Sequence, residues 1–356
     1  MKLLIQPQDG VAPLVAAIKG ARTSVDIVIF RFDRAELEVA LKDAAERGVS
    51  VTALIAYANH GGEKSLRKLE MRLLEAGVTV SRTADDLVRY HDKMLIVDHR
   101  VLYVLSFNFT HLDIDHSRGF AIVTKKKALV QEALRLLAAD TGRTPYEAGL
   151  DTFVVSPVNA RKQLLALIHR AKKELLVYDP KIADAEALRA LTDRAKKGVD
   201  VRVIGTLGRK SPHLKVRPLG GFRLHTRTIV CDQREIFIGS QSLRKAELDS
   251  RREVGLIVRD SKVISGVVNT FEADWGAKES AETVQTTPQV LKKSLKEMVD
   301  KLSPLDPLVK EAVEEVVSKK GNTDLSKTEV KQTVEKAVKE AVRERVEEML
   351  NESAEP

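Results

Sequence analysis

The chain has 356 residues, of which 43% are hydrophobic and 31% charged, a composition typical of globular domains. It contains no run of 18 apolar residues, so no membrane-spanning helix is expected. Its length predicts two domains with an appendage. The net charge is +8, yet the segment from residue 281 onward carries 13 Lys and Arg against 16 Asp and Glu, so the preceding part carries +11. This charge favours anionic partners such as nucleic acid, anionic lipid or phosphate esters, although ordinary solubility charge is the alternative.

The single cysteine and the N-terminus bear on localisation. Cys231 has no second cysteine with which to form an internal disulfide, which favours a reducing, cytoplasmic compartment. The opening residues, MKLLIQPQDG, have too short an apolar run for a signal peptide and predict a strand instead. We therefore expect a cytoplasmic protein, with peripheral contact to an anionic membrane as one option.

The first 150 residues alternate strand and helix patterns. Residues 24–30, 49–57 and 78–83 are rich in apolar and β-branched side chains and predict strands. Residues 34–48 and 63–77 have helical apolar spacing, and each of these segments ends in glycine. Such alternation predicts an α/β domain with a parallel or mixed sheet.

The pattern restarts at residue 152. Residues 152–178 repeat the order of strand, proline, loop, helix and strand that occurs in residues 2–30. Residues 187–205 likewise repeat the helix–glycine–strand pattern of residues 36–55. We therefore predict two similar α/β domains, residues 1–150 and 151–280, packed face to face as a pseudo-twofold pair with a site at the joint.

Residues 281–356 lack strand patterns and predict an all-helical extension. Between residues 325 and 350, valines recur every fourth position from Val330 to Val346, followed by Leu350, which makes one narrow apolar stripe. We expect this helix to dock on the body or to mediate self-association. A membrane-surface helix is less favoured, because the polar face mixes both signs of charge.

Two matching polar motifs stand at equivalent places in the repeat. In RYHDKMLIVDHRVLYVLSFNFT, His91, Lys93 and Asp98 begin a run that otherwise has the pattern of a buried strand. The second half has His225, then Arg227 and Asp232 at the same spacing. A serine follows both histidines at equal distance, and a polar residue follows each serine; these four are Ser106, Asn108, Ser240 and Ser242.

Residues two apart on a strand share a face, so each histidine is expected to point the same way as the cation that follows it. Pseudo-twofold packing would then bring two imidazoles and two cations around one small space. One histidine could attack phosphorus while the other protonates the leaving oxygen, and the cations would stabilise the developing charge. The serines and Asn108 would donate hydrogen bonds to the phosphate, and neither a metal nor a cofactor is required.

These motifs resemble those of the phospholipase D superfamily, His-x-Lys-x-x-x-x-Asp followed by Gly-Ser-x-Asn. The resemblance covers about residues 1–280 and implies a two-lobed fold, both motifs at the lobe interface and a covalent phosphohistidine intermediate. His91, Lys93, Ser106 and Asn108 match the first motif, and His225 and Ser240 match the second. Asp98 and Asp232 also match, and we expect them to support the structure rather than contact substrate.

The sequence departs from the family pattern at three positions. Leu105 stands where the family has glycine, Arg227 where it has lysine, and Ser242 where it has the second asparagine. Lysine and arginine are not equivalent at a phosphate site. The resemblance also implies a downstream acid that orients a catalytic histidine of the opposite lobe. Glu253 fits that place after His225, whereas Gly119 stands at the equivalent place after His91.

We therefore hypothesise that Glu253 orients His91, which makes His91 the nucleophile and His225 the acid. His111, Asp113, Asp115 and His116 look like a metal cluster, but they are close in sequence to the first motif, so we expect them to rim the site. Metal binding is disfavoured because no cysteine joins them. The basic segment 208–225 leads into the second motif and is either a clamp for a polyanion or an anionic headgroup, or a charged surface loop.

Three functions follow from these observations. The first is a metal-independent phosphodiesterase or phosphatidyltransferase acting on phospholipid, similar to cardiolipin synthases and bacterial phospholipases D. The second is an endonuclease of the same superfamily acting on DNA or RNA, which the basic body favours, although aromatics for base stacking are only 4% of residues. The third is a catalytically degenerate binding protein. The intact histidine pair favours catalysis, and the resemblance narrowly favours lipid.

Overall fold

The structure is a computed structural model that describes residues 1–57 and 63–277. These residues belong to one compact unit. The predicted helical extension over 281–356, including the segment 325–350 proposed for self-association, lies outside the described residues.

The first half contains the following elements in chain order: β1 (Lys2–Gln6), α1 (Ala12–Lys19), β2 (Ser24–Ile29), α2 (Ala35–Glu46), β3 (Ser50–Ile55), α3 (Glu63–Glu75), β4 (Thr79–Arg82), β5 (Arg89–Tyr90), β6 (Met94–Val97), β7 (Val101–Leu105), α4 (His111–Asp115), β8 (Ser117–Thr124) and α5 (Lys127–Gly142). The strands predicted at 24–30, 49–57 and 78–83 and the helices predicted at 34–48 and 63–77 are therefore confirmed.

The second half repeats this order: β9 (Phe153–Ser156), α6 (Ala160–Arg170), β10 (Glu174–Ile182), α7 (Ala185–Lys196), β11 (Asp200–Leu207), β12 (Lys215–Arg217), β13 (Arg223–Leu224), β14 (Arg227–Cys231), β15 (Glu235–Gly239), α8 (Lys245–Asp249), β16 (Arg251–Val258) and α9 (Ser261–Gly276). In the described residues α3 has no counterpart there, and the segment 208–225 contains the edge strand β12 rather than being a loop throughout.

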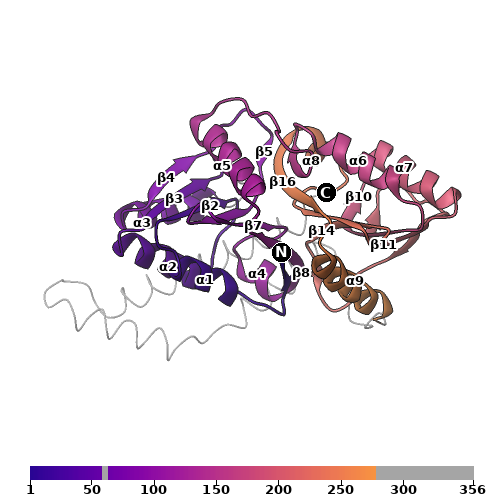
Figure 1. Cartoon of the computed structure of the whole chain (residues 1–356), viewed down its shortest axis with the longest axis horizontal. Helices are drawn as coiled ribbons and strands as arrows, with labels where there is room; N and C mark the ends of the chain where they lie inside the picture. Colours follow the sequence, from indigo (N-terminus) through magenta and orange to yellow (C-terminus); the bar gives the residue numbers. More distant parts are fainter. Residues whose placement is uncertain (58–62, 278–356) are drawn as a thin grey trace, which may run out of the picture. The chain divides into compact units, whose positions relative to one another are not determined.

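Each half builds one mixed sheet. The first has the strand order β1-β8-β7-β6-β2-β3-β4, and the second has the main order β12-β11-β10-β14-β15-β16 with β9 paired to β16. In both, the strand that opens the half runs antiparallel to the last strand of that half, β1 to β8 and β9 to β16. The predicted fold of two similar α/β lobes is thus confirmed (Figure 1).

Helices cover both faces of each sheet because strand side chains alternate. In α2 the residues Leu37, Ala40, Leu41 and Ala44 form one buried face, and they pack in a core with Ile27 of β2. Helix α5 packs on the other face of the first sheet, and α9 does the same for the second sheet. Side chains of α5, α9 and both sheets form one continuous apolar cluster, so the two lobes share a core.

The lobes also exchange strands. Strand β5, which leads into the first motif, pairs with β16 of the second lobe. Strand β13, which leads into the second motif, pairs with β8 of the first lobe. Each motif therefore begins in the partner lobe's sheet and ends in its own, which joins the two motifs at the lobe interface. Among the described residues, no helix combines the length and apolarity needed to cross a membrane.

Candidate active site

The two motif histidines lie where the chain crosses from one lobe's sheet to the other. His91 follows β5, and its amide donates to the Arg252 carbonyl at 2.8 Å. His225 follows β13, and its amide donates to the Arg118 carbonyl at 3.2 Å. Both side chains are buried, with residue exposures of 6% and 5%.

The prediction that the first motif lies on a strand is wrong for residues 91–93. These residues lie between β5 and β6 and belong to neither strand, because the chain leaves the second sheet before it enters the first. His91 and Lys93 nevertheless lie on the same side, since both contact the ring of Phe30. The His91 ring centroid lies 4.5 Å from that of Phe30, and the Lys93 ammonium lies 5.3 Å from it.

Glu253 of β16 holds the His91 ring from the opposite lobe. Nδ1 of His91 lies 3.0 Å from Oε1 and 2.9 Å from Oε2 of the carboxylate, which is fully buried. This contact occupies Nδ1, so Nε2 is the nitrogen left to react. Burial raises the pKa of Glu253 to about 8, and the nearby Glu247 adds to the shift. Burial also lowers the pKa of His91, as do Lys93 and Arg227.

His225 has a different environment. Its Nδ1 lies 3.0 Å from the Ser106 carbonyl oxygen, and because a carbonyl only accepts, Nδ1 carries the hydrogen. Its Nε2 lies 3.5 Å from Oδ2 of Asp113. Gly119 occupies the place equivalent to Glu253, so the carboxylate beside this histidine comes instead from α4. Burial lowers the pKa of His225, and Asp113 opposes that effect.

The two motif cations make the same contact in each lobe. Lys93 Nζ donates to the His91 carbonyl at 2.6 Å, and Arg227 Nη1 donates to the His225 carbonyl at 2.6 Å. Arg227 also places Nε 3.4 Å from the Ser242 hydroxyl, a second contact that a lysine would not make. Burial lowers the pKa of Lys93 to about 7, and Arg227 contributes to the lowering.

The serines and Asn108 are hydrogen-bonded within the protein. The hydroxyls of Ser106 and Ser240 accept backbone N–H groups of the last strand in their own sheets, at 2.9 and 3.1 Å. Asn108 donates its side-chain amide to Asp113 at 2.8 Å, and Ser242 donates its hydroxyl to Asp179 at 3.0 Å. Of these four residues, Ser106 contacts His225 directly through its carbonyl oxygen. Direct contact with a phosphate remains a prediction for all four.

Asp98 and Asp232 lie in tight turns away from the histidines. Their φ angles are 53° and 51°. Asp98 accepts the amides of residues 22–24, and Asp232 accepts those of residues 172–174. Although burial opposes the shift, these amides hold the pKa of Asp98 at about 2. Both aspartates thus fasten a hairpin turn to the start of a central strand.

Sequence reasoning missed the roles of two carboxylates of the site. Asp113 was expected only at the rim, yet it is 2% exposed and accepts the backbone amide of Asn108 at 2.7 Å. Glu247 accepts the backbone amide of Ser242 at 2.7 Å in the second lobe. Asp113 follows Asn108 at the same spacing at which Glu247 follows Ser242, so aligning the two halves would have revealed Asp113 and Glu247 as equivalent acids. His111 and Asp115, from the suspected metal cluster, instead contact Arg34.

Comparison with known proteins identifies the class that this fold and site define. The family described as "Cardiolipin synthase, PLD-like domain" matches residues 14–140 and 164–275, one segment in each lobe. The chain therefore belongs to the phospholipase D superfamily, as a member with two phospholipase D-like lobes.

Three relatives show how widely the similarity extends. A polyphosphate kinase of Prosthecochloris aestuarii is 24% identical over 76% of this chain and 42% of its own length. A mitochondrial cardiolipin hydrolase of Danio rerio is 30% identical over 37% of this chain and 59% of its own. The crystal structure of a polyphosphate kinase from Porphyromonas gingivalis aligns with a TM-score of 0.65 and 17% identity, covering 76% of this chain and 46% of that one. The chain thus spans about half the length of these relatives.

Proposed function

We propose that the protein transfers a phosphoryl-linked group through a phosphohistidine formed on His91, with a phospholipid phosphodiester as its substrate. The observation that carries the proposal is the contact of His91 Nδ1 with Glu253 at 2.9–3.0 Å. Above the raised pKa of Glu253, a neutral imidazole that donates Nδ1–H to this carboxylate presents a basic Nε2 to an incoming phosphorus atom. A degenerate binding protein would have no need of this oriented pair, which supports catalysis.

The proposed reaction has two steps. Nε2 of His91 forms a bond to phosphorus while the bond from phosphorus to the leaving oxygen breaks, and that oxygen takes a proton from Nε2 of His225. Water or an alcohol then attacks phosphorus, His225 accepts its proton, and the bond between phosphorus and His91 breaks. Asp113 at 3.5 Å stabilises the protonated imidazole of His225 in its acid form.

Lys93 and Arg227 supply positive charge in this proposal. Both lower the pKa values of the two histidines, which supports a position for them beside the proposed reacting atoms. Fixed cations in a buried site stabilise charge that develops on phosphate oxygens better than mobile water does. The proposal therefore predicts turnover without an added metal ion.

A phospholipid substrate is supported by the family match and by the cardiolipin hydrolase relatives. A second candidate is phosphoryl transfer on an inorganic polyphosphate chain. It is favoured by the polyphosphate kinases, which match a larger part of this chain, and by additional arginines that lower the histidine pKa values, namely Arg89, Arg223 and Arg251. Cleavage of DNA or RNA is a third possibility that the same experiment tests.

The test is turnover in EDTA with phosphatidylglycerol vesicles, plasmid DNA and polyphosphate offered in parallel. His91→Ala should abolish product formation on the true substrate. His225→Ala, supplied with a phosphodiester whose leaving group needs no protonation, should accumulate a phosphohistidine that acid-free mass spectrometry locates on residue 91. Product from His91→Ala at the wild-type rate, or a phosphoryl group found on residue 225, would contradict the assignment.

A further inference from the structure

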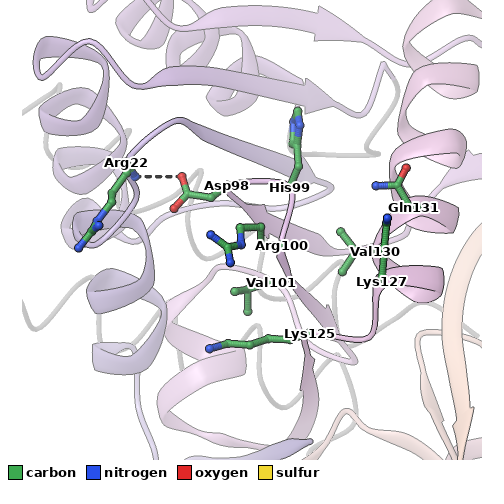
Figure 2. Close-up of a pocket in the computed structure, with 9 residues that line it drawn as sticks. All are labelled: Arg22, Asp98, His99, Arg100, Val101, Lys125, Lys127, Val130 and Gln131. Atoms are coloured by element: carbon green, nitrogen blue, oxygen red, sulfur yellow. Dashed lines mark hydrogen bonds between the residues drawn. The ribbon is translucent and has the colours of Figure 1, made fainter.

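A basic cavity lies in the first lobe (Figure 2), and neither motif histidine is among the residues that line it. It has a volume of about 590 Å³, and residues from the loop before β2, the β6–β7 turn, the β8–α5 turn and the start of α5 line it. Strand β6 separates it from the active site, since Lys93 precedes that strand and Asp98 follows it. An extended strand of this length spans about 15 Å. This cavity is therefore a separate feature of the molecule.

Four cations surround the cavity, namely Arg22, Arg100, Lys125 and Lys127, and all four are exposed. In the described part of the chain, none of the four has a carboxylate as an ion-pair partner. The one carboxylate among the lining residues belongs to Asp98, which is already engaged with the amides of residues 22–24. Mutual repulsion makes such a cluster costly unless an anion joins it.

In the second lobe, a carboxylate of the protein itself neutralises the cation at the equivalent place. Arg259 is the second-lobe counterpart of Lys125, and its Nη2 contacts Glu235 at 2.6 Å. Glu235 also accepts from Arg170 at 2.9 Å. The first-lobe counterpart of Glu235 is Val101, an apolar residue that lines the basic cavity. The first lobe has thus kept the cation and lacks the acid.

The N-terminus of the helix that follows also has an acidic residue in the second lobe and none in the first. In the second lobe Asp260 caps α9 by accepting the amides of Lys262 and Val263, each at 3.1 Å. In the first lobe Lys126 occupies the cap of α5, which has no side-chain cap and no acidic residue in its first turn. Unsatisfied amides at a helix N-terminus favour an anion, and Lys127 and Val130 place this end of α5 at the cavity.

We propose that this cavity is a second, non-catalytic site that binds a phosphate-bearing anion. Guanidinium groups from Arg22 and Arg100 offer forked donors that match phosphate oxygens, and the two lysines add point charges. The volume admits more than a single phosphate, which suits a di- or triphosphate. A lipid headgroup carries the same chemical group, so the experiment separates these two sources. The proposal is independent of the reaction assigned to the active site.

The first arm measures tripolyphosphate binding to the full chain by titration calorimetry at low salt, in a His91→Ala background that suppresses turnover. Arg100→Gln should weaken binding by about ten-fold, which corresponds to about 1.4 kcal/mol. Arg234→Gln is the matched control, because Arg234 is the counterpart of Arg100 in the second-lobe turn and outside the cavity. It removes the same charge and should leave the affinity within two-fold.

Val101→Glu provides an independent variant, since it installs the acid that the second lobe carries and should also weaken binding by about ten-fold. The second arm replaces tripolyphosphate with phosphatidylglycerol vesicles, with phosphatidylcholine vesicles as the reference. If the cavity variants lower the affinity for tripolyphosphate, the ligand is a soluble anion. If they lower only the binding of phosphatidylglycerol vesicles, the ligand is a lipid phosphate. The proposal would be overturned if Arg100→Gln and Arg234→Gln changed the affinity equally in both arms. Val101→Glu would then be folded and bind with wild-type affinity.

Discussion

At the scale of single residues, the site is asymmetric. His91 has a carboxylate from the opposite lobe on its Nδ1, whereas His225 has a carbonyl on Nδ1 and a carboxylate near Nε2. A histidine held through Nδ1 by an acid is suited to attack, and one whose Nε2 faces an acid is suited to carry a proton. The two halves of the repeat have therefore diverged toward different proposed roles.

Glu253→Gln tests the role of the acid beside His91. The amide can still accept from Nδ1, but it cannot carry the negative charge that Glu253 carries above its pKa of about 8 and that would stabilise the imidazole as phosphorus is attacked. We expect formation of the phosphohistidine to slow by about 10- to 100-fold, with substrate affinity nearly unchanged. Rapid-quench kinetics and equilibrium binding separate the two effects. The control is Glu272→Gln, a substitution at an exposed residue of α9. Equal losses of substrate binding and of intermediate formation in Glu253→Gln would refute the assignment.

Asp92 provides a prediction about pH and stability. It is 2% exposed, and its Oδ2 has no hydrogen-bond partner. Burial raises its pKa to about 6, so the folded state binds this proton more tightly than the unfolded chain does. Stability contributed by the protonated form is present at low pH and is lost as the pH rises from about 4, the usual aspartate pKa, towards that raised value.

Asp92→Asn should therefore raise the free energy of unfolding at pH 8 by about 1–3 kcal/mol and have little effect at pH 4. Urea unfolding at both values measures this. Asp98→Asn is the opposite case, because the pKa of Asp98 is held at about 2 and its ionised form is the stabilising one. That variant should lose stability at pH 8. A gain for Asp92→Asn that is equal at both pH values would argue against the raised pKa.

At the scale of elements, one pair of neighbouring strands in each lobe, β7 with β8 and β15 with β16, explains one departure from the family pattern. In the second lobe Gly239 of β15 faces Gly255 of β16, and the ring of Phe237 covers both. In the first lobe Leu105 faces Ala121 in the same position. Leu105 is 1% exposed and packs in the core, so its side chain fills space that the phenylalanine ring takes in the other lobe.

Gly255→Ala should accordingly be destabilising. A Cβ at residue 255 would lie 2.7 Å from Cζ of Phe237 and closer still to Cε2, so the ring or the strand would have to move. We expect a loss of about 1–3 kcal/mol in the free energy of unfolding, measured by chemical denaturation. Gly276→Ala, at the end of α9 with open space around it, should be neutral or slightly stabilising. Similar losses for the two variants would show that crowding by Phe237 is not the cause.

At the scale of the whole molecule, two buried ion pairs join the lobes. Arg118 of β8 reaches Asp274 of α9, with Nε 2.8 Å from Oδ2. Arg252 of β16 reaches Asp140 of α5 at 3.0 Å. The two arginines occupy matching positions in the repeat, and so do the two aspartates, which makes the pairs equivalent. The carbonyls of the same two arginines hold the backbones of His225 and His91, which ties lobe packing to site geometry.

Asp274→Asn leaves Arg118 buried without its charge partner and should cost about 3–5 kcal/mol of stability. Asp200→Asn breaks exposed pairs of Asp200 with Lys215 and Arg202, and Arg202 keeps Glu174 and Glu272 as partners, so it should cost at most about 1 kcal/mol. Thermal and urea unfolding of both variants checks this. Because the pair joins the lobes, we also expect Asp274→Asn to reduce turnover at temperatures below its own unfolding transition. A cost comparable to that of Asp200→Asn would mean that the buried pair is not holding the lobes together.

Much of the architecture could be predicted because the chain contains an internal repeat, so that its two halves can be compared with each other. The alternation of strands and helices follows from apolar periodicity, and the repeat follows from segments that match at a constant offset in and around the motifs. The position of Glu253 relative to His225 also follows from spacing within one strand-rich segment, and the resemblance assigned it to the opposite lobe. These features depend on residues that are close in sequence or equivalent in the repeat.

The tertiary structure decided the rest, because it depends on contacts between segments distant in sequence. Residues 91–93 have a strand-like pattern, yet they lie outside any strand because the preceding residues pair with the other lobe. Asp113 reaches His225, and four cations from three segments surround one cavity, only after the chain has folded. The sequence by itself thus determined the lobes and the motifs, whereas three-dimensional packing determined which groups face each histidine and where unpaired charge collects.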